Sequence, residues 1–139
     1  MPVFKTTFRV SWVETDAARV VHFSNYFRYF ERAEEEFYRS LGLSFDIIRQ
    51  EYDIWLPRIE AFARFRSPLK FNDLVEVELR IDELREKSVR YGFKIFNKED
   101  GRLVAEGYMV VVAADKKKGE AIEIPKEIVE KLRPFVDQL

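Results

Sequence analysis

An apolar stripe at helical spacing runs through residues 25–41, and it constrains the fold of this chain more than any other feature. Apolar side chains recur every three or four positions, and charged side chains occupy the opposite face. The stripe consists of Tyr26, Phe30, Ala33, Phe37 and Leu41, widened by Phe27 and Tyr38. A helix of this span is roughly 25 Å long at about 1.5 Å per residue. A helix with so broad an apolar face needs a sheet to lie against.

Both ends of this helix carry cap residues. Ser24 is the predicted N-cap, because its hydroxyl can accept a hydrogen bond from an exposed amide of the first turn. Gly42 is the predicted C-terminal cap, because glycine readily adopts the left-handed conformation that closes a helix.

Alternation of apolar and polar residues predicts the strands of the sheet. Residues 4–13 alternate, with one face made of Phe4, Thr6, Phe8, Val10 and Trp12. Residues 74–84 and 88–97 alternate in the same way, and residues 59–66 and 103–115 are two further strands. Asp100 and Gly101 supply a hairpin turn. Short helices are predicted at residues 45–51 and after Pro125.

The predicted order is a strand, a long helix and then four strands in a meander, without repeats or linkers. It indicates an α+β fold in which a five-stranded antiparallel sheet wraps around one long central helix, in one domain over residues 1–139. Such a sheet has open edges, and pairing of two copies edge to edge would cover one of them. We therefore expect an oligomer.

Composition excludes several functional classes. The 24 Lys and Arg residues balance 25 Asp and Glu residues, which leaves no basic excess for binding nucleic acid. With no cysteine and one histidine, thiolate chemistry and Cys- or His-based metal sites are not expected. No apolar run approaches the roughly 20 residues of a membrane span, and the N-terminus lacks a signal-peptide pattern. We expect a cytoplasmic protein whose many surface charges fit a thermophile.

Asp16 and the start of the helix form the one catalytic constellation that the residues support. Amides at a helix N-terminus, here near Phe23 and Ser24, can donate to a carbonyl oxygen on which negative charge develops. A carboxylate near that carbonyl can attack it or activate a water molecule. Together they indicate acyl transfer or hydrolysis. A Ser-His-Asp triad would have to pair His22 with Ser24, whose spacing does not favour the required geometry.

The stretch VETDAARVVHFSNYFRYFERA, residues 13–33, resembles the signature of the 4-hydroxybenzoyl-CoA thioesterase-like family of hotdog-fold proteins. In that signature D-T-D-x-x-G-x-V precedes an aromatic residue or His and then N-Y-x-x-Y-x-E-x-A. The resemblance covers nearly the whole chain. It implies hydrolysis of a small acyl-CoA to free acid and CoA, with no cofactor besides the CoA of the substrate. It also implies a homodimer or a tetramer with active sites at the dimer interface. Asp16 matches the catalytic aspartate, as base or nucleophile, and Phe23 matches the residue whose backbone amide polarises the thioester carbonyl.

Two residues depart from the signature. Glu14 replaces the first acid of the triplet, which is a mild change. Arg19 stands where the family usually has Gly, a residue that tolerates positive φ. Three interpretations stay open: the loop runs differently, Arg19 reaches an acidic acyl group or a CoA phosphate, or activity has decayed.

The resemblance assigns supporting roles to residues outside the loop. His22 stands where relatives carry Tyr, Trp or His, and packing near the pocket is preferred over acid-base chemistry for it. Glu31 matches the family's helix acid. Arg58 matches a recurrent arginine, and we expect it to pair with Glu31 or Glu34 in a structural ion pair rather than in catalysis.

Coenzyme A requires cations near its phosphates. Arg85 and Lys87 match a basic stretch with this role in relatives, and Lys87 is preferred over the run Lys116, Lys117 and Lys118. Trp55 and Leu56 are candidates for an acyl pocket, with core packing as the alternative.

Two alternatives to hydrolysis remain. A hydratase or dehydratase of the same fold would need a His-acid pair, for which His22 is the sole candidate. A non-catalytic acyl-CoA-binding protein would bind CoA without releasing its thiol.

Overall fold

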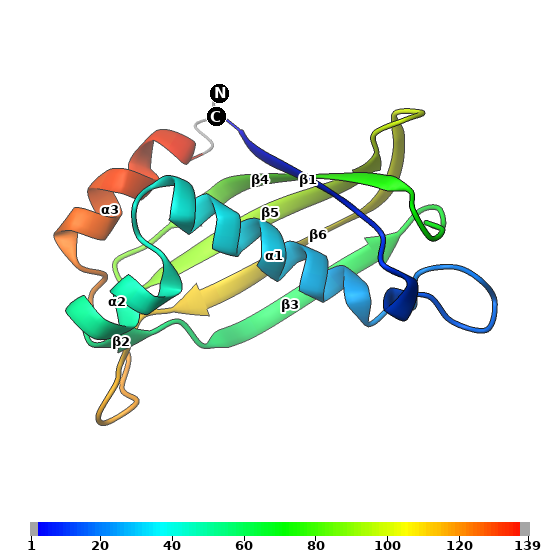
Figure 1. Cartoon of the computed structure of the whole chain (residues 1–139). Helices are drawn as coiled ribbons and strands as arrows, with labels where there is room; N and C mark the ends of the chain where they lie inside the picture. Colours follow the sequence, from blue (N-terminus) through cyan, green and yellow to red (C-terminus); the bar gives the residue numbers. More distant parts are fainter. Residues whose placement is uncertain (1–2, 137–139) are drawn as a thin grey trace.

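The computed structural model describes residues 3–136, and within that range five antiparallel strands form one sheet (Figure 1). Its spatial order is β1 (Phe4–Arg9), β4 (Leu74–Leu84), β5 (Ser88–Asn97), β6 (Arg102–Val112) and β3 (Arg58–Phe65). The helices are α1 (Asn25–Ser40), α2 (Phe45–Glu51) and α3 (Lys126–Leu132), and β2 (Ile54–Trp55) pairs with β7 (Ala114–Asp115). Short 3-10 helices span Trp12–Glu14 and Arg133–Phe135. None of the helices in residues 3–136 is long and apolar enough to cross a bilayer.

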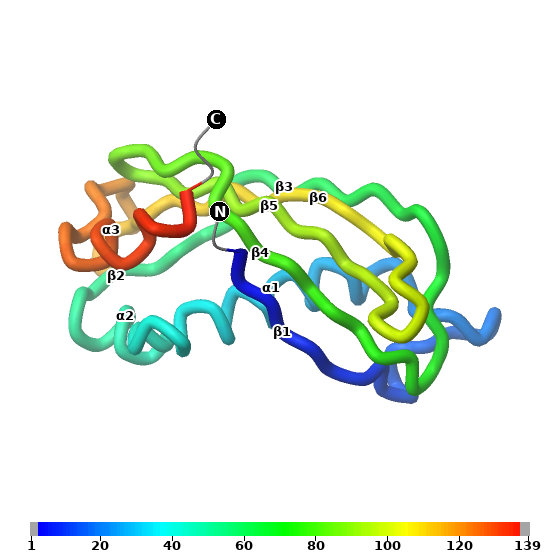
Figure 2. The backbone as a smooth tube through the Cα atoms, turned by 90° about the horizontal axis from the view of Figure 1, so that it is seen from above, coloured from blue at the N-terminus to red at the C-terminus, as the bar shows by residue number. Residues whose placement is uncertain are grey.

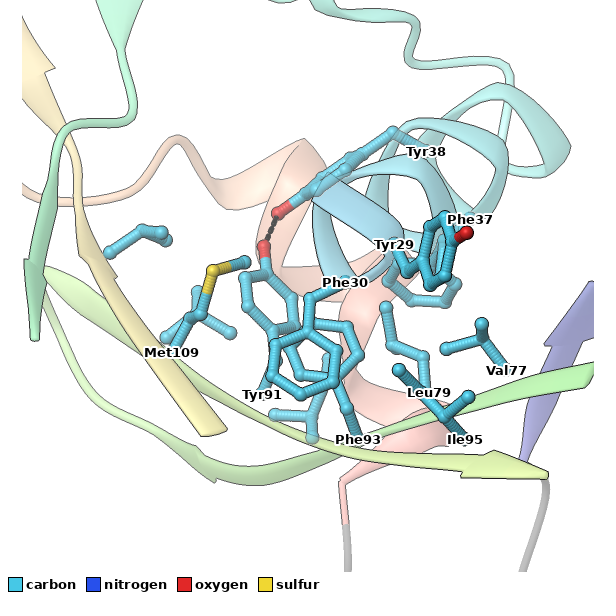
Figure 3. Packing of buried hydrophobic residues seen from close by; sticks show 14 of the residues in the cluster. Tyr29, Phe30, Phe37, Tyr38, Val77, Leu79, Tyr91, Phe93, Ile95 and Met109 are labelled. Atoms are coloured by element: carbon cyan, nitrogen blue, oxygen red, sulfur yellow. Dashed lines mark hydrogen bonds between the residues drawn. The ribbon is translucent and has the colours of Figure 1, made fainter. Parts of the chain in front are cut away.

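Helix α1 lies along one face of the sheet, as two perpendicular views show (Figure 1 and Figure 2). Its apolar stripe faces the strands: Phe30 stacks on Phe93 of β5 with ring centroids 4.4 Å apart (Figure 3). The helix ends one residue earlier than predicted. Gly42 follows with a φ of 73°, and the Leu43 amide donates to the Tyr38 carbonyl at 2.9 Å. This is the glycine cap that the sequence predicts.

The start of α1 is where the sequence predicts it, but the predicted cap bond is absent. Ser24 occupies the N-cap position, and its side chain makes no capping hydrogen bond to α1. The hydroxyl instead lies 2.8 Å from Nδ1 of His22. The predicted start of α1 is therefore confirmed, whereas the predicted capping hydrogen bond from the Ser24 side chain is wrong.

Strands β4 and β5 alternate as predicted. Val77 pairs with Ile95 and is buried toward α1, whereas Glu78 pairs with Lys94 on the outer face. This inward face and the α1 stripe form the core (Figure 3). The prediction of two-faced strands is confirmed for both.

The predicted four-strand meander is wrong for β3. Strands β4, β5 and β6 are consecutive, but β3 pairs with β6, with Ala61 opposite Met109, and forms an outer edge. The chain passes through α2 and β2 before β3, so it enters the sheet at the edge away from β4. A Cβ atom at Gly107 of β6 would lie 2.0 Å from the Phe62 carbonyl oxygen. This pairing therefore requires glycine at position 107.

The first strand is shorter than predicted, and Trp12 is not on a buried face. Strand β1 ends at Arg9, and the indole of Trp12 is 73% exposed. The Ser11 amide donates to the Glu14 carboxylate at 2.8 Å, and the Glu14 amide donates to the Ser11 carbonyl at 3.0 Å. This reciprocal pairing turns the chain out of the sheet.

The predicted strand at residues 103–115 is two strands. The Ala113 amide donates to the Lys87 carbonyl at 2.9 Å, and Ala114 then pairs with Trp55 of β2. Strand β2 is absent from the sequence prediction because two residues carry no measurable alternation. The helix predicted after Pro125 is confirmed as α3, with Ile128 and Leu132 buried.

Candidate active site

Asp16 lies at the turn of a short hairpin between the first 3-10 helix and α1. Thr15 and Val21 form a bridge across the hairpin, and the Asp16 amide donates to the Val20 carbonyl at 2.9 Å. Within the turn, the Ala18 amide donates to Oδ1 of Asp16 at 2.8 Å. One carboxylate oxygen is therefore fixed by the backbone, as in an Asx turn. The other carboxylate oxygen takes no part in this bond.

Arg19 adopts a φ of 65°, in the left-handed region. Its amide donates to the Asp16 carbonyl at 2.8 Å, which closes the turn. The loop thus uses at position 19 a conformation that glycine adopts freely and that an L-residue with a side chain adopts at a cost. The backbone at Arg19 is therefore strained relative to glycine at the same position.

Glu14 anchors the hairpin to the helix. Its Oε1 accepts from the hydroxyl of Tyr29 in α1 at 2.8 Å and from the Ser11 amide at 2.8 Å. Its carbonyl accepts from the side chain of Asn25, the first residue of α1, at 2.9 Å. Burial and then the Glu14 hydrogen bond raise the pKa of Tyr29 well above its ordinary value. Tyr29 has no role in the sequence prediction, and its place in the N-Y-x-x-Y stretch is the signal that could have found it.

Phe23 presents a free amide at the start of α1. The amides of Asn25 and Tyr26 donate to the carbonyls of His22 and Phe23 at 2.9 and 3.2 Å. The Phe23 amide donates to no acceptor within residues 3–136. Its ring is 62% exposed, with the ring of Phe65 from β3 at a centroid distance of 6.5 Å. A free N–H at a helix N-terminus can polarise a carbonyl group.

His22 is exposed, and its one polar side-chain partner in the described chain is the Ser24 hydroxyl. The two side chains are therefore in hydrogen-bond contact. The Ser24 amide also donates to Nδ1 of His22, at 3.3 Å. No carboxylate in residues 3–136 completes a Ser-His-Asp triad or a His-acid pair at this position.

Asp16 and Phe23 line two different pockets. The Asp16 pocket measures about 780 Å³, and the pocket beside Phe23 measures about 370 Å³. Tyr26 lines the Phe23 pocket. Burial raises the pKa of Tyr26. The two residues are seven positions apart in the sequence, and one copy of the chain does not place them in a common pocket.

The Asp16 pocket contains two residues that the sequence prediction did not assign. Lys70 and Phe71 lie on its wall, with Trp12 and Arg19. Lys70 and Phe71 lie beside the hairpin because the Val21 amide donates to the Leu69 carbonyl at 2.8 Å. This bond connects the hairpin to the segment before β4. No local pattern near residue 70 signals this long-range contact.

Glu34, in the middle of α1, is fully buried and paired with Arg58 from the start of β3. The guanidinium of Arg58 also lies 3.4 Å from Glu31. The predicted pairing of Arg58 with Glu31 or Glu34 is therefore confirmed for both. Burial raises the pKa of Glu34 to about 7, the neighbouring Glu31 adds to the rise, and Arg58 opposes it.

The surroundings of Glu34 are polar but closed. The hydroxyls of Tyr38 and Tyr91 hydrogen-bond to each other in the core (Figure 3). Burial raises the pKa of both phenols. Glu31 and Arg58 line a separate pocket of about 380 Å³ with Trp55 and Leu56, the two residues suggested for an acyl pocket.

The turn between β4 and β5, which contains the predicted CoA-binding cations, lies at the other end of the sheet from the blue loop that precedes α1 (Figure 1). Arg85 forms an ion pair with Glu83 at the end of β4, and Lys87 begins the turn into β5. Lys116 forms an ion pair with Asp53 at 3.6 Å. The structure of one chain therefore does not bring Arg85 and Lys87 to the candidate catalytic carboxylate.

Comparison with known proteins extends the resemblance seen in the N-terminal motif. A putative esterase of Aquifex aeolicus is 34% identical over 90% of this chain and 94% of its own length. The acyl-CoA thioester hydrolase YbgC of Escherichia coli is 28% identical over 91% of this chain and 93% of its own. A solved structure of a gentisyl-coenzyme A thioesterase superposes with a TM-score of 0.80 at 31% identity, covering 89% of this chain and 98% of that one.

The family model of the thioesterase-like superfamily matches residues 10–132, a span that includes the Asp16 hairpin, all of α1 and four strands of the sheet. This match covers most of the chain and agrees with the motif at residues 13–33. The chain therefore belongs to the thioesterase-like superfamily.

Proposed function

We propose that this chain hydrolyses the thioester of a small acyl-CoA to a free acid and CoA. The observation that carries the proposal is the Asp16 hairpin, which leads from a carboxylate held in a turn to a helix start whose Phe23 amide is free. Two relatives, an acyl-CoA thioester hydrolase and a gentisyl-coenzyme A thioesterase, support the same chemistry by their names.

In the first form of the mechanism Asp16 is a general base. It takes a proton from a water molecule, whose oxygen forms a bond to the thioester carbon. The carbonyl electrons move to oxygen, where the Phe23 amide donates a hydrogen bond to the developing charge. When the carbonyl reforms, the C–S bond breaks, and the CoA thiolate takes up the proton that Asp16 removed from water.

In the second form Asp16 is the nucleophile. Its oxygen bonds to the thioester carbon, the C–S bond breaks, and a mixed anhydride of Asp16 and the acyl group forms. Water then attacks the anhydride and releases the acid. A single turnover in ¹⁸O-labelled water separates the forms when water attacks the anhydride at its Asp16 carbonyl. The released acid then lacks label and Asp16 carries it, whereas general-base catalysis labels the acid and leaves Asp16 unlabelled.

The exposed edge of β3 supports assembly into a homodimer. Three large apolar side chains on this strand are exposed: Ile59, Phe62 and Phe65. Strand β1, at the other edge of the sheet, exposes no comparable group within Phe4–Arg9. An edge strand with exposed apolar side chains is a favourable surface for pairing with a second copy. A tetramer would be a pair of such dimers.

Antiparallel pairing of two β3 strands would complete the active site. The Arg58 end of β3 lies on the side of the sheet where Lys87 precedes β5, because Arg58 and Val89 both pair with Val111 of β6. The Phe65 end contacts Tyr26, with ring centroids 5.0 Å apart. A two-fold axis across β3 therefore brings the Lys87 side of one copy toward the Asp16 side of the other. The proposed fold is the hotdog arrangement, with α1 as the helix that the sheet wraps.

Release of free CoA thiol from a panel of aromatic and aliphatic acyl-CoAs tests the proposal. Turnover of at least one ester by the wild type, lost in Asp16→Asn, is the expected result. If no ester is hydrolysed while CoA still raises the melting temperature, the chain is an acyl-CoA-binding protein. If neither occurs, both functions are contradicted.

A further inference from the structure

We propose that the pocket beside Asp16 is an acyl subsite that selects acyl groups carrying a negative charge, such as a carboxylate or a phenolate. The inference rests on the proposed hydrolysis and adds the substrate class. The pocket measures about 780 Å³. Its walls combine the carboxylate of Asp16, the cations Arg19 and Lys70, and the apolar side chains Trp12, Val13 and Phe71.

The two cations are free to bind a ligand. Neither Arg19 nor Lys70 forms an ion pair with a carboxylate in residues 3–136. Elsewhere on the described surface many arginines are paired, as Arg66 is with Glu106 at 3.0 Å. Both cations are exposed at the rim of a concave site, where an anionic group can accept hydrogen bonds from a guanidinium and an ammonium.

The backbone of Arg19 gives an independent argument. Its φ of 65° places a long side chain in a conformation that costs roughly 1–2 kcal/mol for a residue with a Cβ atom. Strain of this kind at a site is consistent with a functional demand for the side chain. The same backbone directs the Arg19 side chain to the wall of the pocket that contains Asp16.

The apolar wall fits the body of an acyl group. Trp12 and Phe71 meet edge to face with ring centroids 5.3 Å apart, and both rings are exposed, Trp12 at 73% and Phe71 at 43%. Val13 is 88% exposed beside them. Exposed aromatic rings that line a concavity are a common surface for a flat or apolar ligand.

The presence of Asp16 in this pocket indicates which part of the substrate binds in it. In either form of the mechanism the thioester carbon must lie within reach of the Asp16 carboxylate. The acyl group is bonded directly to that carbon, whereas the phosphates of CoA lie at the far end of the pantetheine arm. A charge recognised by Arg19 and Lys70 in this pocket is therefore a charge on the acyl group.

A pair of substrates matched in shape tests the subsite: 4-carboxybenzoyl-CoA and 4-methylbenzoyl-CoA. The wild type is expected to favour the carboxylate ester in kcat/KM by about tenfold or more, the scale of a charge-assisted hydrogen bond. Arg19→Gly removes the cation and suits the positive φ, so folding is preserved. This variant should lose most of the preference, with little change for the methyl ester, and Arg19→Lys should keep part of it. Lys70→Gln should act in the same direction as Arg19→Gly.

The control is Lys94→Gln, which removes one positive charge from the opposite face of the sheet and should leave the preference unchanged. Equal hydrolysis of both esters by the wild type overturns the subsite and leaves the hydrolase. If Arg19→Gly slows both CoA esters equally but spares the corresponding N-acetylcysteamine thioesters, the cation serves a CoA phosphate and the acyl subsite is also overturned. If no ester is hydrolysed, titration of terephthalate against wild type and Arg19→Gly still decides the subsite, because binding must be lost in the variant.

Discussion

The carboxylate of Glu34 lies fully buried inside the fold and in contact with the guanidinium of Arg58. This pair joins the middle of α1 to the first residue of the edge strand β3. Arg58 also donates to the Leu56 carbonyl at 2.7 Å, so one side chain fixes the entry of the chain into β3. Loss of Arg58 should be strongly destabilising because it leaves the buried Glu34 carboxylate without its partner, whereas Arg58 keeps Glu31 at 3.4 Å when Glu34 is replaced.

Glu34→Gln should change how stability depends on pH. The pKa of Glu34 is raised to about 7 in the folded chain, so the folded state binds the proton more tightly than the unfolded state, where the value is 4.5. The contribution of Glu34 to the free energy of unfolding is therefore largest below pH 4.5 and is lost as pH rises through about 7. The total loss is about 3 kcal/mol. Urea unfolding from pH 5 to 8 should show a steeper fall for wild type than for the variant.

The matched control for that experiment is Glu35→Gln, one position along α1 and only half-buried. It should leave the pH slope of the wild type unchanged. Parallel slopes for wild type and Glu34→Gln would contradict a raised pKa at Glu34.

Asp16→Asn should lower kcat for thioester hydrolysis by about 10² to 10⁴, the usual contribution of a positioned base. The amide oxygen of asparagine can still accept from the Ala18 amide, so the turn and the melting temperature should be preserved. Thiol release and thermal unfolding of the same preparation measure the two effects. Retained turnover in a folded variant would contradict the role of Asp16.

Arg19→Gly should raise the free energy of unfolding by about 1 kcal/mol, because glycine relieves the left-handed strain at φ 65°. Ala18→Gly in the same turn is the control. Position 18 is not among the residues with positive φ, so glycine there should destabilise through the larger entropy of the unfolded chain. Chemical denaturation should show a higher free energy of unfolding for Arg19→Gly and a lower one for Ala18→Gly. Destabilisation by both variants would contradict strain at Arg19.

Ile59→Lys should convert a dimer to a single chain. The side chain is 63% exposed, so the substitution costs little within one chain but places a charge in the proposed β3 interface. Light scattering should give the mass of one chain, and thiol release should fall with it because the proposed active site is formed by two copies. Thr7→Lys, on the exposed part of the opposite edge strand, should leave both unchanged. A dimer that survives Ile59→Lys and dissociates with Thr7→Lys would place the interface at β1.

Much of the fold follows from periodic patterns in the sequence. The stripe of α1 and the alternation of β4 and β5 place Phe30, Val77 and Phe93 on facing surfaces, and they meet in the core. Periodicity does not reveal which strand lies beside which. The edge position of β3 depends on the path of the chain through α2 and β2 and on the missing Cβ atom at Gly107.

The candidate site could be predicted only where its residues are close in sequence. Asp16, Phe23 and the helix start lie in one stretch, so motif and capping arguments find them together. Lys70 reaches the Asp16 pocket through a backbone bond between Val21 and Leu69, which no local pattern encodes. Trp12 was placed on the wrong face because the reciprocal Ser11 and Glu14 hydrogen bonds redirect the strand.

The attachment of Glu14 to Tyr29 has a consequence for how this enzyme can diverge. The hairpin is tied to α1 through Glu14 and Asn25, not through the residues of its turn. Substitutions at positions 17–19 can therefore accumulate in a lineage without displacing the backbone that carries Asp16. Such a chain can drift toward new acyl groups while its hydrolytic step is inherited intact, and Arg19 is the position at which that drift would first be visible.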